Sequence, residues 1–139
     1  MKRLTVVAIA LVIGSTGCAA GRSKNEPGII ALRNSTGATL TGVRISEDRD
    51  SKSGGGRLGE VSPVLPDVTY TFVRPTDAPP LPRRVRVRWR DTSNLDRSGA
   101  ASTEDPLRQA TGAENEALLF EILPGGMVQA RLDRASGPR

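Results

Sequence analysis

Residues 84–90 read RVRVRWR, a stretch in which arginine alternates with an apolar residue. Successive side chains of a β-strand point to opposite faces, so this stretch has one apolar face and one cationic face. The cationic face comprises Arg84, Arg86, Arg88 and Arg90. A register shift of one residue would bury these four guanidinium groups, which makes the pairing of the strand strongly specified. The stretch therefore predicts a strand with one solvated face and one buried face, anchored in the core by Trp89.

Other short runs after residue 27 also alternate with period two and are separated by Gly, Pro, Asn and Asp. This pattern is typical of antiparallel β structure. Together with the arginine stretch, the candidate strands are residues 28–34, 38–47, 56–61, 68–75, 83–91, 117–123 and 127–134. We expect an all-β fold, a small antiparallel β-sandwich of about seven strands with an immunoglobulin-like or transthyretin-like arrangement.

The connections between these strands carry turn signals. The sequences NSTG at 34–37 and PGG at 124–126 predict two hairpins, one near each end of the domain. Residues 91–116 contain few apolar side chains, so we expect a long loop there. Within it, Asp105 as N-cap and Pro106 as first helical residue predict a single helical turn.

The residue types present limit the chemistry that the chain can perform. It has no histidine, and Cys18 is its single cysteine. This excludes Ser/His/Asp and Cys/His catalytic sets, the usual zinc sites and a disulfide within the chain. Glu47, Asp48 and Asp50 could hold Ca²⁺ only loosely, because no Glu closes the loop at the usual spacing. We therefore expect no enzyme, no bound metal and no cofactor.

The chain opens with MKRLTVVAIALVIGSTGC, in which two cations precede an apolar run and small residues. The run is too short to cross a bilayer, which needs about 20 apolar residues, and it indicates an export signal. The segment Ser15-Thr16-Gly17-Cys18 resembles the lipobox of bacterial lipoproteins, whose cysteine becomes the lipid-bearing first residue. The resemblance implies diacylglycerol on the sulfur of Cys18, an acyl group on its amine and a stable membrane anchor.

The residues around the cysteine leave two readings of processing and location. In a diderm bacterium, Ala19 after the lipidated cysteine implies the outer membrane, with the protein facing the periplasm. Cys18-Ala19-Ala20 also fits the ordinary signal peptidase, which would cut after Ala20 and discard the cysteine.

The lipoprotein interpretation divides the chain into four parts. They are a signal peptide (1–17), a lipidated flexible tether (18–27), a β-sandwich domain (28–134) and a disordered tail (135–139).

Two functions are consistent with this organisation. The first is a lipid-anchored, non-catalytic binding or assembly module of the cell envelope, with an envelope protein as partner. The second is a domain that binds a small ligand or an anionic glycan through the arginine strand and residues 91–116. The four arginines could bind an anion or an acidic partner, or they could form a solvated outer face. We do not expect nucleic acid as a partner, because no aromatic side chain on that face could stack a base.

Overall fold

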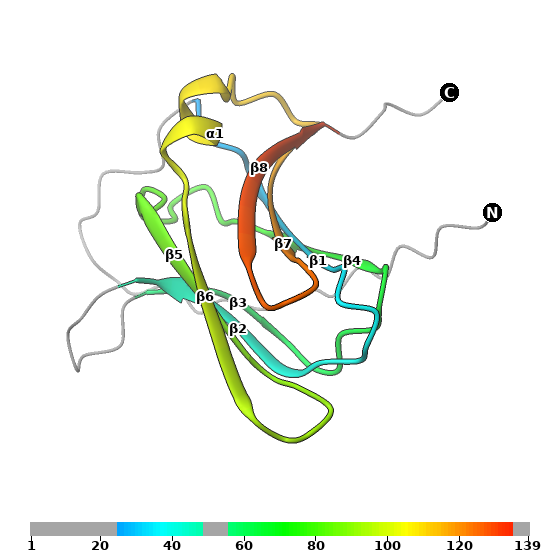
Figure 1. The fold of residues 1–139 in the computed structure, drawn as a ribbon. Coiled ribbons are helices and arrows are strands. Elements are labelled where there is room, and N and C mark those ends of the chain that lie inside the picture. The colour runs from blue at the N-terminus through cyan, green and yellow to red at the C-terminus, as the bar shows by residue number, and fades with distance from the viewer. Residues whose placement is uncertain (1–24, 49–55, 135–139) are drawn as a thin grey trace, which may run out of the picture.

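The computed structural model describes residues 25–48 and 56–134, which form two packed β-sheets and one short helix (Figure 1). The strands are β1 (Ile29–Asn34), β2 (Thr41–Glu47), β3 (Arg57–Val61), β4 (Thr69–Val73), β5 (Arg84–Arg90), β6 (Asp96–Ser102), β7 (Glu116–Ile122) and β8 (Val128–Arg134). The helix α1 (Glu104–Gln109) follows β6. The expected all-β sandwich is confirmed, with eight strands in the described residues where about seven were predicted.

The two sheets have the strand orders β4-β1-β7-β8 and β3-β2-β5-β6. Neighbouring strands are antiparallel except β1 and β7, which are parallel. In the immunoglobulin arrangement the first strand lies beside the second, whereas here β1 and β2 belong to different sheets. The order agrees with the transthyretin-like alternative.

Strand β6 lies in residues 91–116, where the prediction of a long loop was wrong. It pairs antiparallel with β5 along its whole length, with Arg84 opposite Ser102. Its inward positions hold small residues, including Gly99 and Ala101, because β6 is an edge strand that closely approaches β8 of the other sheet. A strand of small residues lacks the apolar alternation by which strands are recognised in a sequence.

The helix begins two residues earlier than predicted, with Thr103 as N-cap instead of Asp105. Thr103 is fully buried, and its hydroxyl donates a hydrogen bond to the carbonyl oxygen of Pro82. Its backbone N–H donates to Arg83 O at 2.9 Å. Thr103 is thus attached to the segment before β5, which determines where the helix starts, and Pro106 becomes its third residue.

The hairpin predicted at residues 124–126 is confirmed. Strands β7 and β8 are antiparallel, with Ile122 opposite Val128. Gly125 and Gly126 have φ angles of 91° and 88°, which favour glycine, and this explains the PGG sequence of the turn.

The hairpin predicted at residues 34–37 was wrong, because this turn carries the chain from one sheet to the other. Asn34 is fully buried, and its side-chain amide donates to Ala38 O at 2.6 Å and Val64 O at 3.2 Å. Its Oδ1 accepts the backbone N–H of Thr36 at 3.0 Å. These bonds stabilise the turn locally and are equally compatible with flanking strands that do not pair.

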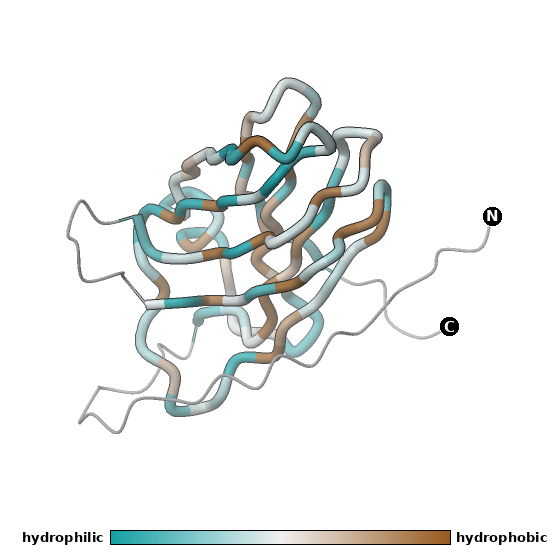
Figure 2. The backbone as a smooth tube through the Cα atoms, turned by 90° about the horizontal axis from the view of Figure 1, so that it is seen from below, coloured by the Kyte–Doolittle hydropathy of each residue, from teal (hydrophilic) through white to brown (hydrophobic). Residues whose placement is uncertain are grey.

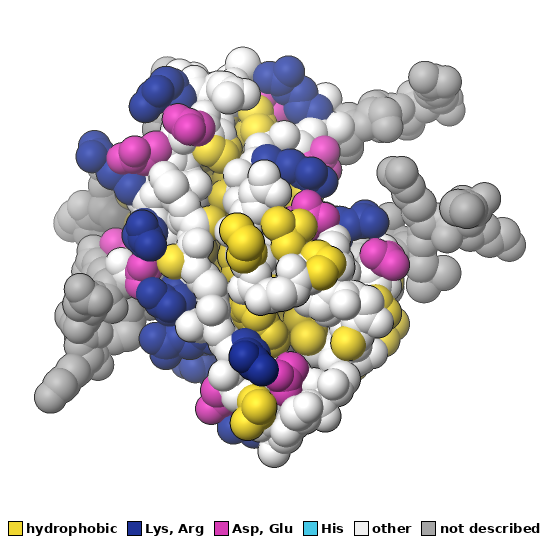
Figure 3. All heavy atoms as spheres, in the orientation of Figure 1, with side chains coloured by type: hydrophobic (Ala, Val, Ile, Leu, Met, Phe, Trp, Pro, Cys, Tyr) yellow, Lys and Arg dark blue, Asp and Glu magenta, His cyan; other side chains and the backbone are white. Residues whose placement is uncertain are grey.

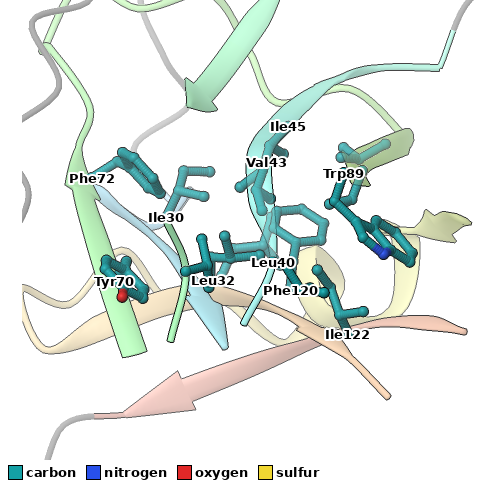
Figure 4. Packing of buried hydrophobic residues seen from close by; sticks show 14 of the residues in the cluster. Ile30, Leu32, Leu40, Val43, Ile45, Tyr70, Phe72, Trp89, Phe120 and Ile122 are labelled. Carbon is teal, nitrogen blue, oxygen red and sulfur yellow. The ribbon is translucent and has the colours of Figure 1, made fainter. Parts of the chain in front are cut away.

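The core lies between the two sheets (Figure 4), and apolar residues alternate with polar ones along the strands (Figure 2). Its buried members are Ile30, Leu32, Leu40, Val43, Ile45, Val64, Tyr70, Phe72, Leu81, Val85, Val87, Trp89, Leu118, Phe120 and Ile122. In β5 the apolar face is buried and the arginine face points outward, as the alternation predicted.

The residues before β1 are held against the domain, although the sequence assigned them to the tether. Arg74 donates from Nη1 to Pro27 O at 3.0 Å and from Nη2 to Pro79 O at 2.7 Å. Glu26 Oε2 accepts the backbone N–H of Leu81 at 3.0 Å, and Glu26 Oε1 lies 3.5 Å from Arg74 Nη2. Both charged side chains are mostly buried, so Glu26 and Pro27 belong to the folded domain.

Candidate functional site

The solvent-facing side of the sheet β3-β2-β5-β6 contains an open hollow of about 590 Å³, which we call the arginine hollow. Its lining residues are Gly42, Arg44, Glu60, Arg86, Arg88, Trp89, Arg90, Asp96, Arg97 and Ser98. Five arginines therefore face two carboxylates in this hollow. In Figure 3, cationic side chains gather at the left of the molecule, over β5 in the orientation of Figure 1.

Two arginines of the hollow are paired with its two carboxylates. Arg44 Nη2 lies 3.4 Å from Glu60 Oε1, with both side chains nearly half exposed. Arg90 Nε donates to Asp96 Oδ1 at 3.1 Å. These are solvent-exposed pairs, which contribute little to stability but keep each guanidinium near one position.

Two further arginines are held by carboxylates outside the hollow. Arg86 Nε donates to Asp48 Oδ1 at 2.9 Å, and Arg97 Nε donates to Asp91 Oδ2 at 3.0 Å. The hydrogen bond from Arg86 lowers the pKa of Asp48 below its ordinary value, against the opposing effect of desolvation, and Arg84 adds to the lowering. The hydrogen bond from Arg97 likewise lowers the pKa of Asp91. Both carboxylates therefore remain ionised at neutral pH.

Arg88 differs from these four arginines. Its side chain is exposed, and within the described residues it has no hydrogen bond or ion pair. In the sheet it lies directly opposite Arg44 of β2 on one side and Ser98 of β6 on the other. Opposed residues in a sheet have Cβ atoms about 4.5–5.5 Å apart, and like charges in such pairs are destabilising. Among residues 25–48 and 56–134, the cation at the centre of the hollow therefore has no counter-ion.

Three of the four arginines predicted from the sequence, Arg86, Arg88 and Arg90, line the hollow. Arg84 does not, and its Nε donates to Asp48 Oδ2 at 2.9 Å at the end of the strand. Arg44 was not among the residues predicted from the sequence, although its neighbours Val43 and Ile45 are buried and period two places it on the solvent face. The missing information was that β2 pairs with β5.

The segment 91–116 contributes to the hollow through β6, which supplies Asp96, Arg97 and Ser98. Its final residues serve a different purpose. Glu116 is fully buried, and its Oε1 accepts backbone N–H groups from Gly112 at 2.7 Å and Ala113 at 3.1 Å. Only the first half of the segment therefore lines the hollow.

The remaining sequence candidates carry no site in the described residues. The carboxylate of Asp48 is occupied by Arg84 and Arg86, and Asp50 lies outside the described residues. Residues 25–48 and 56–134 contain no group of three His, Cys, Asp or Glu side chains arranged to hold a metal. Cys18, the tether up to residue 24 and the tail 135–139 lie outside the described part of the chain. No helix in that described part has the length and apolar character needed to span a membrane.

Comparisons with known proteins add little to this geometry. No family model matches the chain, and no curated protein matches it. A solved structure described as an NMR structure of a protein from Eubacterium rectale is similar over 78% of this chain and 88% of that chain, with 14% identity and a TM-score of 0.34. A likeness at this level carries no argument about function.

Proposed function

We propose that the protein is a non-catalytic binding module of the bacterial cell envelope, anchored to a membrane by lipid on Cys18. The proposed binding surface is the arginine hollow. The single observation that carries this assignment is the concentration of four arginines, Arg44, Arg86, Arg88 and Arg90, on one open sheet face, with the central Arg88 unpaired among the described residues. A row of cations of this kind raises the local electrostatic potential and attracts anionic groups.

The proposed anchor is supported by the opening sequence and by the way the domain begins. The lipobox-like segment ends at Cys18, and Glu26, which is held by Arg74, already belongs to the folded domain. A chain extends by at most about 3.3–3.6 Å per residue, so the intervening residues reach roughly 25–30 Å. A lipid on Cys18 would keep the domain within that distance of the membrane surface.

Expression of the full chain in a diderm bacterium tests the anchor. We expect the wild-type protein in the outer-membrane fraction and Cys18→Ser in the soluble fraction. Intact-mass analysis of the wild type should show a chain that begins at Cys18 and carries acyl groups. A chain of unmodified mass that begins at Gly21 would contradict the anchor and indicate the ordinary signal peptidase.

The hollow also favours a second candidate function, recognition of a small anionic ligand instead of assembly with a protein. The double variant R86A/R88A separates the two. Loss of anion binding with unchanged capture of a crosslinked envelope partner supports ligand recognition. Loss of the partner with unchanged anion binding supports assembly. The matched control is R83A, because Arg83 is exposed and lies outside the hollow.

A further inference from the structure

We infer that the arginine hollow binds a phosphate group, held across three strands by Arg44, Arg88 and Ser98. This inference deepens the proposed function and rests on the arginine hollow being the binding surface. It concerns the chemical class of the ligand, which the proposed function leaves open.

The first reason is the alignment of three polar side chains across neighbouring strands. The register places Arg44, Arg88 and Ser98 side by side on β2, β5 and β6. An anion placed between Arg44 and Arg88 would contact both guanidinium groups and remove the repulsion between them. Two like charges directly opposite each other destabilise a sheet. Residues that lower stability in this way are expected mainly at functional sites.

The surrounding ion pairs provide the second argument. Arg86 and Arg90, which lie on either side of Arg88 along β5, are held by Asp48 and Asp96. Their guanidinium groups already have carboxylate partners, which leaves Arg88 as the arginine of the hollow that has none among the described residues. The hollow is thus suited to one compact anionic group and not to a long polyanion.

The number of donors distinguishes phosphate from carboxylate. Ser98 Oγ accepts a hydrogen bond from Arg86 Nη1 at 3.1 Å, and its own hydrogen has no acceptor among the described residues. Two guanidinium groups and this hydroxyl offer donors from three directions. A phosphate group has three strong acceptor oxygens, whereas a carboxylate has two, which one arginine can occupy through a bidentate pair. The row therefore matches a tetrahedral phosphate better than a planar carboxylate.

The volume of the arginine hollow indicates the size of the molecule to which the phosphate would be attached. At about 590 Å³ the hollow is larger than a phosphate ion and falls in the range of small-molecule sites. The hollow has room for a phosphate attached to a sugar, to glycerol or to a lipid headgroup, and its open side would admit the remainder of a larger molecule.

The test titrates the purified mature chain with glycerol 3-phosphate and, at the same ionic strength, with acetate and sulfate. We expect glycerol 3-phosphate to bind and to shift the NMR signals of Arg88 and Ser98. The variant R88A should lower its affinity at least tenfold, whereas R83A should leave it within about twofold. Equal binding of acetate, or equal losses in R88A and R83A, would overturn the inference.

The pH dependence provides a second readout. The charged groups that face the hollow are Arg44, Arg86, Arg88, Arg90, Arg97, Glu60 and Asp96. The chain has no histidine. The second proton of a phosphomonoester leaves near pH 6. Affinity for glycerol 3-phosphate should therefore rise between pH 5 and 7.5, while affinity for sulfate stays constant. A flat profile for both would contradict binding of the phosphate dianion.

A vesicle-binding experiment distinguishes a phosphate in a lipid headgroup from a phosphate in a soluble molecule. Phosphatidylcholine vesicles that contain phosphatidic acid, whose phosphate is a monoester like that of glycerol 3-phosphate, are compared with vesicles in which oleate supplies the same negative charge. Binding that requires phosphatidic acid and Arg88, without binding of glycerol 3-phosphate, would identify a lipid headgroup as the source. Equal binding to both kinds of vesicle would show attraction to charge alone and would overturn the inference. These titrations do not depend on Cys18, so their failure is separable from failure of the anchor.

Discussion

Gly99 of β6 and Val128 of β8 approach so closely that a Cβ atom at Gly99 would lie 2.6 Å from Val128 Cγ2 and 3.2 Å from Gly126 O. The two strands are edge strands of different sheets, so this contact closes one side of the sandwich. The opposite side has a related contact, where a Cβ at Gly59 of β3 would lie 3.1 Å from the ring of Phe72 in β4. At both sides a glycine lets an edge strand of one sheet meet a side chain of the other.

The first prediction concerns Gly99. Substitution G99A should lower the free energy of unfolding by about 1–3 kcal/mol, because the new methyl group overlaps Val128 and forces the edge strands apart. Urea unfolding followed by the fluorescence of Trp89 measures this change. The control is G56A, since a Cβ at Gly56 meets nothing within 4 Å. Equal stability of the two variants would show that the contact is not close in solution.

The second prediction concerns the pair that holds the N-terminal segment. Substitution R74M leaves the mostly buried Glu26 carboxylate without its cation and should cost about 3–5 kcal/mol. The matched control is R108M on α1, whose exposed pair with Asp105 should contribute about 0–1 kcal/mol. Thermal unfolding of both variants checks the difference. A similar, small loss in both would mean that burial does not strengthen the Arg74 pair.

The third prediction concerns Glu116 and acid stability. Burial raises the pKa of this carboxyl, but hydrogen bonds from Thr111 and Gly112 and from the side chain of Arg134 outweigh it and lower the pKa below 4.5. A group with a lowered folded-state pKa stabilises the protein fully above its unfolded-state value, and this stabilisation is lost as pH falls through the folded-state value. E116Q should therefore be less stable at pH 7 and should lose less stability than the wild type between pH 5 and pH 3. Urea unfolding across this range measures both effects, and parallel pH profiles would contradict the assignment.

The fourth prediction concerns the central arginine of the hollow. Substitution R88T removes a cation that faces Arg44 and breaks no ion pair in the described residues, so the free energy of unfolding should stay the same or rise by about 0.2–1 kcal/mol. The comparison variant is R86T, which breaks the pair with Asp48 and should not stabilise the protein. Unfolding at low salt shows the contrast best, because salt screens exposed charges. A destabilised R88T would mean that Arg88 has a structural partner.

The alternation in residues 84–90 was sufficient to predict which side of β5 is buried and which carries the arginines. This works because the orientation of side chains along one strand depends only on the backbone of that strand. The same reasoning predicted the approximate limits of seven strands and the hairpin at residues 124–126. It failed for β6, whose inward positions Gly99 and Ala101 are small, because Gly99 lies against Val128 of β8.

The alternation of apolar and polar residues along a strand did not predict which strands lie beside it in the sheet. The turn at Asn34 has the same local hydrogen bonds whether the flanking strands pair or separate, and it proved to connect different sheets. The proposed binding surface, the arginine hollow, depends on that non-local choice. Local alternation placed Arg88 on a solvated face, but only the pairing of β2 and β6 with β5 brought Arg44 and Ser98 beside it. Strand pairing is decided by the packing of the whole core, and residues distant in the sequence become neighbours only when that core has formed.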